Sequence, residues 1–99
     1  MRNLILASTF AAAAIVSTPA LATGKMTCDV AEADMKPRAN LEAQLLAEGW
    51  QVRKSKVDGG CYEVYGTLPT GEKVEAYFDP ATFEKLYVAQ RGKVLFEKK

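Results

Sequence analysis

The sequence contains no histidine, the side chain that most often serves proteins as a general base and as a metal ligand. Beyond residue 22 it holds a single serine, Ser55, which lies outside any G-x-S-x-G nucleophile motif. A phosphate-binding loop is not indicated either, because Gly59-Gly60 precedes an expected strand rather than a helix. We therefore predict that the protein is not an enzyme and that it uses no cofactor.

An excess of one charge is also missing. The chain has 13 Lys and Arg residues against 12 Asp and Glu residues, and one of the 13, Arg2, lies in a segment that we expect to be removed. Proteins that bind nucleic acids or anionic membranes generally carry a basic excess. The neutral balance therefore argues against both kinds of partner.

A hydrophobic run of membrane-spanning length is absent as well. The apolar run of residues 4–16 is shorter than the roughly 20 residues that a bilayer requires, and no second run follows it. Arg2 precedes this run and Ala20-Leu21-Ala22 follows it, which is the pattern of a cleaved secretory signal peptide. We predict that residues 1–22 are this signal peptide, and that the mature protein is periplasmic or secreted without stable membrane insertion.

Cysteine occurs only twice, as Cys28 and Cys61. An even number of cysteines in a small exported chain indicates a disulfide, and two cysteines allow only one intramolecular pairing. A redox-active pair or a metal site is the alternative, but the chain has neither a C-x-x-C motif nor a histidine. A covalent link is also physically useful, because a domain of this size has a core of marginal strength.

The chain beyond residue 22 shows no repeat and no linker, so we expect one domain. A lead segment, residues 23–36, carries Cys28 and precedes the domain proper, residues 37–99. Helix-forming residues come first and strand-like residues follow, which predicts an α+β fold. We expect one N-terminal helix packed on a four- to five-stranded antiparallel sheet, with one disulfide.

The expected helix occupies residues 37–48, which are rich in helix formers and begin with a proline suited to the first helical turn. Gly49 fits the left-handed position that ends a helix, after which Trp50 should fold back onto Leu45. The apolar side of this helix is expected to consist of Leu41, Leu45 and Leu46.

The residues after Gly49 read as strands joined by turns. Residues 58–60 and 69–71 each fit a three-residue hairpin loop that has a left-handed glycine in third place. These loops predict the cross-strand pairs Val52–Gly66, Lys54–Val64, Tyr62–Phe78, Val64–Ala76 and Gly66–Val74. The helix would then cover the sheet face that collects Trp50, Val52, Tyr62, Val64 and Leu68, with Leu86 and Val88 continuing it.

Two further turns are indicated near the end of the chain. Asp79-Pro80-Ala81-Thr82 has proline in the second position, and Arg91-Gly92 suggests a tight turn into a last strand. The register of that strand stays open, because Val94 and Phe96 compete with Leu95 for the inner face.

Cys61 conflicts with simple alternation, which directs its side chain to the face away from the helix, whereas Cys28 lies just before the helix. Either a bulge at the glycine pair turns Cys61 inward, or the lead segment wraps around the sheet edge to reach it. We favour the bulge, because a glycine pair permits one and Cys61 lies at a strand end.

Three segments of the chain resemble the PepSY-like small secreted proteins. They are Gly49-Trp50-x-Val52, Cys61-Tyr62-Glu63-Val64-Tyr65, and Gly71-x-x-Val74-Glu75-Ala76-Tyr77-Phe78-Asp79-Pro80-x-Thr82. The resemblance implies a non-catalytic helix-on-sheet module outside the cytoplasm that inhibits or regulates peptidases, or that senses or binds at the cell envelope. An envelope protein or a peptidase is then the expected partner. Many PepSY repeats continue with Thr-Gly, whereas Phe83 follows Thr82 here, which leaves the course of residues 80–86 open.

The sheet face away from the helix holds the candidate contact residues. Tyr65, Tyr77 and Tyr87 share this outward parity, and surface tyrosines supply contact area for a peptide or protein partner. Alternatively, they form cross-strand pairs that only stabilise the sheet. Glu63 and Glu75 share the same face and could hold a hard cation, although water exposure would deny them the burial that active sites use.

A small-ligand or cation-binding periplasmic protein is therefore the alternative function, and an enzyme is a distant third. The last strand could also accept a peptide by edge addition.

Overall fold

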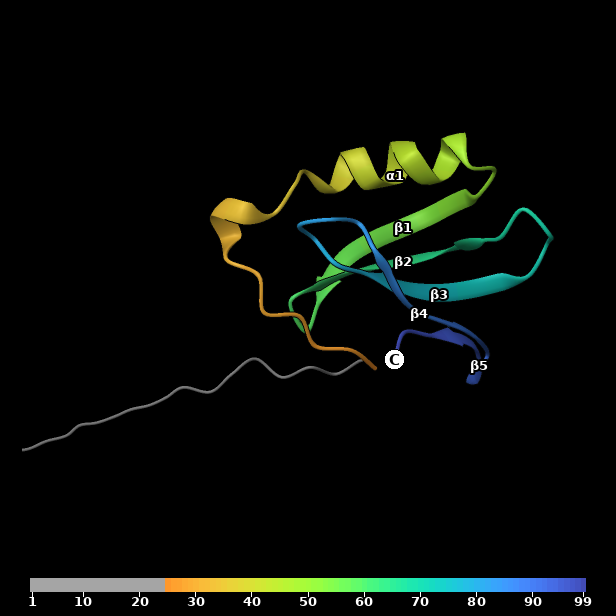
Figure 1. The fold of residues 1–99 in the computed structure, drawn as a ribbon. Helices are drawn as coiled ribbons and strands as arrows, with labels where there is room; N and C mark the ends of the chain where they lie inside the picture. The colour runs from red at the N-terminus through yellow and green to blue at the C-terminus, as the bar shows by residue number, and fades with distance from the viewer. Residues whose placement is uncertain (1–24) are drawn as a thin grey trace, which may run out of the picture.

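The structure, a computed structural model, describes residues 25–99, so the predicted signal peptide of residues 1–22 lies outside the described residues. A short 3-10 turn, η2 (Glu32–Asp34), and one α-helix, α1 (Arg38–Ala47), precede the strands. The strands are β1 (Gln51–Asp58), β2 (Cys61–Thr67), β3 (Lys73–Phe78), β4 (Lys85–Gln90) and β5 (Lys93–Glu97). They form one antiparallel sheet in the order β1-β2-β3-β4-β5, and α1 runs along one face of it (Figure 1). The expected helix-on-sheet α+β architecture is thus confirmed, with five strands in the described part of the chain.

Helix α1 ends as predicted, at Gly49, whose φ is +98°. The backbone N–H of Trp50 donates to the carbonyl of Leu45 at 2.9 Å, and the N–H of Gly49 donates to that of Leu46 at 3.0 Å. These two bonds are the Schellman motif, which satisfies the last carbonyls of the helix and turns the chain into β1. Leu41 and Leu45 are buried, but Leu46 is 60% exposed, so its expected place on the apolar side is wrong. The helix covers the sheet with a stripe too narrow to include both adjacent leucines.

The main core lies between α1 and the sheet. It consists of Leu41, Leu45, Trp50, Tyr62, Val64, Val74, Ala76, Phe78, Phe83 and Val88, with Met35, Val52 and Leu68 packed against it. The rings of Trp50 and Phe78 meet edge to face with centroids 5.9 Å apart, and the hydroxyl of Tyr62 donates to the carbonyl of Lys36 at 2.6 Å. The core therefore joins the helix, the inner face of the sheet and the end of the lead segment.

The β2–β3 hairpin has the predicted register throughout, with Tyr62 opposite Phe78 and Val64 opposite Ala76. Its loop is the expected three-residue one: the N–H of Leu68 donates to the carbonyl of Glu72 at 2.9 Å, and Gly71 has a φ of +105°.

The β1–β2 hairpin departs from the predicted register. Its loop has two residues, Gly59-Gly60, because Asp58 pairs with Cys61; φ values of +63° and +85° match the type I′ turn that favours such loops. Ser55, rather than Lys54, therefore lies opposite Val64. Val52 nevertheless lies opposite Gly66, as predicted, because a bulge between Val52 and Lys54 adds one residue to β1.

Further bulges change the expected course of the last two strands. Tyr77 pairs with Tyr87 but Phe78 pairs with Lys85, so β4 has one extra residue and Leu86 leaves the helix-covered face, contrary to expectation. In β5 the pairs Val88–Phe96 and Ala89–Val94 leave Leu95 as the extra residue, and every residue of this edge strand is exposed.

The turn at residues 79–82 is built on Asp79, whose carboxylate accepts hydrogen bonds from the N–H groups of Ala81 at 2.7 Å and Thr82 at 3.2 Å. Phe83, which stands where many PepSY repeats have glycine, adopts a left-handed φ of +66°. Its ring is buried near that of Tyr62, with centroids 6.4 Å apart. Burying a phenylalanine contributes roughly 1.5–3 kcal/mol, which offsets a left-handed strain of roughly 1–2 kcal/mol.

The lead segment crosses the sheet face away from α1, and the predicted Cys28–Cys61 disulfide is present. In Figure 1 this segment, drawn in orange, runs below the sheet near the β1–β2 turn. Cys61 packs there in a second cluster with Tyr77, Leu86, Tyr87 and Ala89, against Met26 and Cys28. The favoured inward bulge at Cys61 is therefore wrong: the two-residue turn preserves alternation, and the lead segment wraps around the sheet to reach the cysteine.

Gly60 is the residue that lets the lead segment approach so closely. A Cβ atom at this position would lie 2.2 Å from the carbonyl oxygen of Cys28, and the N–H of Cys28 donates to the carbonyl of Gly59 at 2.8 Å. The glycine pair therefore forms the hairpin turn and also receives the lead segment.

Replacing both cysteines, Cys28→Ser with Cys61→Ser, should lower the free energy of unfolding by up to about 4 kcal/mol, the loop-closure entropy for this separation. Urea unfolding of the variant and of wild type, each with and without reductant, measures the difference. Reductant should change only the wild type. Equal unfolding midpoints for oxidised wild type and the double variant would contradict the stabilising role of the bond.

Candidate functional site

The outer face, defined as the sheet face turned away from α1, carries all five residues that the sequence singled out. Two rows cross the central strands: Glu63–Tyr77–Tyr87 and Tyr65–Glu75–Ala89. The rows place Glu63 opposite Tyr77, Tyr65 opposite Glu75 and Tyr77 opposite Tyr87, in agreement with the shared face predicted for these residues. The two rows differ in what covers them.

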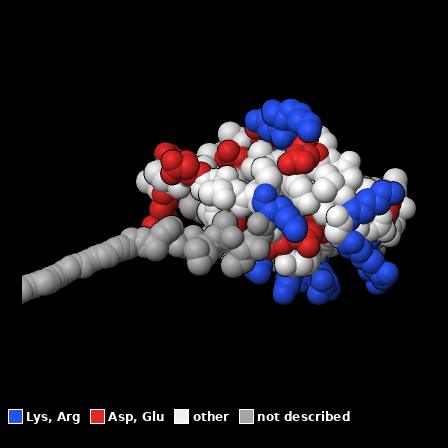
Figure 2. Space-filling model, turned by 90° about the horizontal axis from the view of Figure 1, so that it is seen from below, with Lys and Arg blue, Asp and Glu red and all other residues white. Residues whose placement is uncertain are grey.

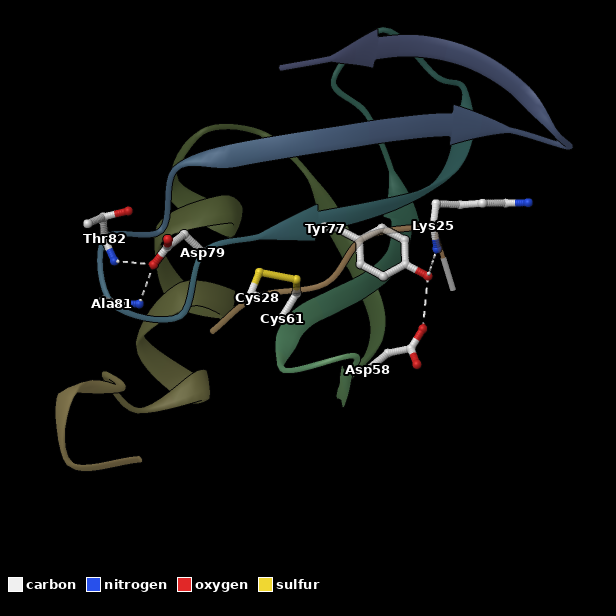
Figure 3. The surroundings of a disulfide bond; sticks show 8 residues. All are labelled: Lys25, Cys28, Asp58, Cys61, Tyr77, Asp79, Ala81 and Thr82. Atoms are coloured by element: carbon white, nitrogen blue, oxygen red, sulfur yellow. Dashed lines mark hydrogen bonds between the residues drawn. A yellow bond between two sulfur atoms is a disulfide. The ribbon is translucent and has the colours of Figure 1, made fainter. Parts of the chain in front are cut away.

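Tyr77 and Tyr87 lie in the closed half of the outer face, which consists of Cys61, Tyr77, Leu86 and Tyr87 beneath the lead segment. They are only 1% and 6% exposed, and their rings meet edge to face with centroids 5.9 Å apart. The hydroxyl of Tyr77 donates to Asp58 Oδ2 at 2.9 Å and accepts from the backbone N–H of Lys25 at 3.4 Å (Figure 3). Burial, reinforced by the hydrogen bond to Asp58, raises the pKa of this hydroxyl far above 10. The open surface expected from three tyrosines is therefore reduced to Tyr65.

Glu63 lies under the same face and is 2% exposed, so the expectation that water reaches it is wrong. Burial raises the pKa of its carboxyl above 4.5, against the lowering effect of hydrogen bonding with Tyr65 and Tyr77. Its Oε1 atom has no hydrogen-bond partner in the described part of the chain, and the nearest cation is the Lys56 ammonium at 3.8 Å.

A metal centre gains little support from this arrangement. Residues 25–99 contain no group of three or more His, Cys, Asp or Glu side chains that could hold a metal ion. Lys56 already supplies a positive charge beside Glu63, and Glu75 stands in the neighbouring row.

The open half of the outer face is a groove of about 480 Å³ beside the closed half. Its polar lining includes Gln51, Arg53, Tyr65, Lys73, Glu75 and Arg91. Ala89 lies at the boundary, because it lines the groove and also packs in the second cluster. The groove therefore occupies the part of the sheet that the lead segment leaves uncovered.

Three cationic groups surround the ring of Tyr65. Lys54 Nζ lies 4.8 Å from the ring centroid, Arg53 Cζ 5.6 Å and Lys56 Nζ 5.8 Å, all within the range of cation–π attraction. Burial, followed by hydrogen bonding with Glu63, raises the pKa of the Tyr65 hydroxyl to about 12. Tyr65 therefore stays neutral at physiological pH and can donate a hydrogen bond.

The bulge in β1 is what brings Arg53 and Lys54 to the same ring. A bulge lets two successive residues oppose one partner residue, so their side chains no longer alternate between the faces. Gly66 allows the bulge, because a Cβ there would lie 2.3 Å from the carbonyl oxygen of Gln51. Sequence reasoning missed Arg53, Lys73 and Arg91, since charged residues at outward strand positions or in turns look like ordinary solvated surface. Only their shared parity with Tyr65 could have drawn attention to them.

Comparison with known protein families finds that the family described as peptidase propeptide and YPEB domain, PepSY_2, matches residues 6–87. That range includes α1, β1, β2 and β3, both cysteines and the outer-face row of Tyr65 and Glu75. No curated protein and no solved structure matches the chain significantly.

Glu63→Gln should gain stability relative to wild type as the pH rises. A carboxyl whose folded-state pKa is raised stabilises the fold fully below about its unfolded value of 4.5, and this contribution is lost as the pH rises through the folded-state pKa. Urea unfolding from acidic to neutral pH measures the difference between variant and wild type. Glu84→Gln, at a half-exposed position, serves as the control for removing one carboxylate. A difference between Glu63→Gln and wild type that does not change with pH would contradict the assignment.

Gly66→Ala should destabilise the protein by at least about 2 kcal/mol, because the new Cβ would collide with the Gln51 carbonyl where β1 bulges. Gly92→Ala is the matched control: it meets no atom within 4 Å and costs only left-handed strain of roughly 1 kcal/mol. Chemical unfolding compares the two. If Gly66→Ala lowered the free energy of unfolding no more than Gly92→Ala does, the prediction would be wrong, because β1 would then move aside from the new Cβ without loss of stability.

Proposed function

The chain belongs to the peptidase propeptide and YPEB domain family, and on that basis we propose that it is an exported, non-catalytic module that binds and restrains or senses a protein partner. The partner is a peptidase or another envelope protein. The observation that carries this proposal is the open half of the outer face, where an accessible tyrosine ring is surrounded by cations beside a groove.

Export is supported by the disulfide and by the signal-like pattern of residues 1–22. Disulfides persist in oxidising compartments and are rare in the cytosol. Within residues 25–99 no helix has the length and apolar character needed to cross a bilayer.

A binding role without catalysis is supported by the chemistry of the outer face. The sequence has no histidine, and the carboxyl of Glu63 lies below the surface beside a lysine rather than facing the groove as a free base. Tyrosine and arginine, which the open half presents together, are the side chains most enriched at energetically important contacts between proteins.

The edge strand β5 is the rival surface, because it exposes Val94, Leu95 and Phe96. Its bulge at Leu95 interrupts the regular row of backbone groups that an added strand would need. A cation-binding role is disfavoured by the lysine beside Glu63. The open half of the outer face is therefore the surface we assign to the partner.

Site-specific photo-cross-linking tests this assignment. A photoreactive residue at position 65 or 67, in the protein expressed in its own host, should yield one discrete adduct that mass spectrometry identifies as an envelope protein or peptidase. The control position is 46, which is exposed on α1. No adduct from 65 or 67, or the same adducts from position 46, would contradict the proposal.

A further inference from the structure

The open half concentrates positive charge from separate parts of the chain. Arg53 comes from β1, Lys73 from the start of β3, and Arg91 from the turn between β4 and β5, and all three are exposed at the groove. Figure 2, which views the molecule from below, shows Lys and Arg side chains at the end remote from the grey segment and also along the other edges of this face. Acidic side chains lie nearer to that segment and in the centre.

None of these three cations forms an ion pair with another residue of the described part of the chain. The ion pairs among residues 25–99 join Lys56 to Glu63 and Lys98 to Glu84, and neither involves Arg53, Lys73 or Arg91. Arg53, Lys73 and Arg91 line one groove, where like charges repel one another and an added anion would relieve that repulsion. Glu75 is the only carboxylate among the residues that line the groove.

We infer that the open half binds an acidic polypeptide segment, one whose Asp or Glu carboxylates contact Arg53, Lys73 and Arg91 while its backbone lies along the groove. This inference rests on the proposed function and specifies the chemistry of the partner. Arginine suits the role, because its planar guanidinium binds a carboxylate through two parallel hydrogen bonds.

A peptide fits the groove better than a phosphate-rich partner does. Gln51, Tyr65 and Thr67 offer groups that pair with backbone amides, and Glu75 accepts hydrogen bonds that a peptide can donate and a phosphodiester cannot. The 13 basic and 12 acidic residues of the whole chain also lack the excess that nucleic-acid or bilayer binding requires. The positive charge of the groove, together with its hydrogen-bonding groups, therefore favours an anionic segment of a protein as the ligand.

Titration of the purified protein with a short fluorescent peptide of alternating Glu and Ser, followed by anisotropy and by amide NMR, tests the inference. We expect saturable binding with shifts confined to the groove residues, and no binding of the matching Gln–Ser peptide. Affinity should fall as ionic strength rises from about 0.01 to about 0.15 M, because the screening length shortens from about 30 to about 8 Å.

The double variant Arg53→Gln/Arg91→Gln should bind the acidic peptide about tenfold more weakly, the combined loss of two partly exposed charge contacts. Arg38→Gln, an exposed arginine at the start of α1, is the matched control and should leave affinity unchanged. Absence of saturable binding, or equal affinity in the double variant and the control, would overturn the inference. Tighter binding of inorganic phosphate, or of vesicles of phosphatidylglycerol and phosphatidylethanolamine, would overturn the choice of a peptide.

The outcome of the peptide titration can be distinguished from the outcome of the cross-linking test. A specific adduct from position 65 together with no peptide binding would leave the proposed function standing and reject an acidic segment as its ligand. Peptide binding that depends on Arg53 and Arg91, with no cross-linked partner, would support the groove chemistry and reject the proposed class of partner.

Discussion

The disulfide between Cys28 and Cys61 holds the lead segment on the sheet face that the single helix does not cover, and the rest of the structure depends on that placement. A sheet with one helix has one unprotected face, and a domain this small has little hydrophobic core to spare. The lead segment covers Tyr77 and Tyr87, so the sheet gains a second, smaller core. The glycine pair at the β1–β2 turn makes this possible, since it forms the turn and leaves space for the carbonyl of Cys28.

Because the lead segment covers only part of the outer face, the two halves of that face acquire different properties. The closed half is largely apolar, and its Tyr77 hydroxyl is hydrogen-bonded to Asp58. The open half keeps Tyr65 accessible, and the bulge in β1 adds the charges of Arg53 and Lys54 beside it. The division follows from the position of Cys61, because the disulfide fixes where the lead segment crosses the outer face. The exposed charged and aromatic side chains therefore lie in the part of the outer face that the lead segment does not cover.

Local chemistry explains which parts of this architecture are predictable from sequence. The helix end at Gly49 and the loop at residues 69–71 were predicted correctly, because each is set by a glycine and its immediate neighbours. The β1 register was wrong, since a two-residue turn and a bulge together place Val52 opposite Gly66 just as a three-residue loop would. A bulge in β4 moved Leu86 off its predicted face, and a bulge at Leu95 sets the register of β5, which the sequence had left open. Tyr65 was identified from alternation, and the predicted pairs already imply Arg53 opposite it, but Lys54 reaches the ring only through the bulge.

The cations around Tyr65 lie near the buried carboxylate of Glu63. Their positions show whether they stabilise that carboxylate or are placed for binding. Among residues 25–99, only Lys56 approaches Glu63 within ion-pair distance, at 3.8 Å. The pKa of Glu63 is still raised, which means that the surrounding charges do not outweigh the cost of burial. Arg53 and Lys54 lie within 6 Å of the tyrosine ring and are exposed to solvent, and Arg53 also lines the groove. Stabilising the interior does not require them there, and their exposed position favours the proposed binding of an anionic segment.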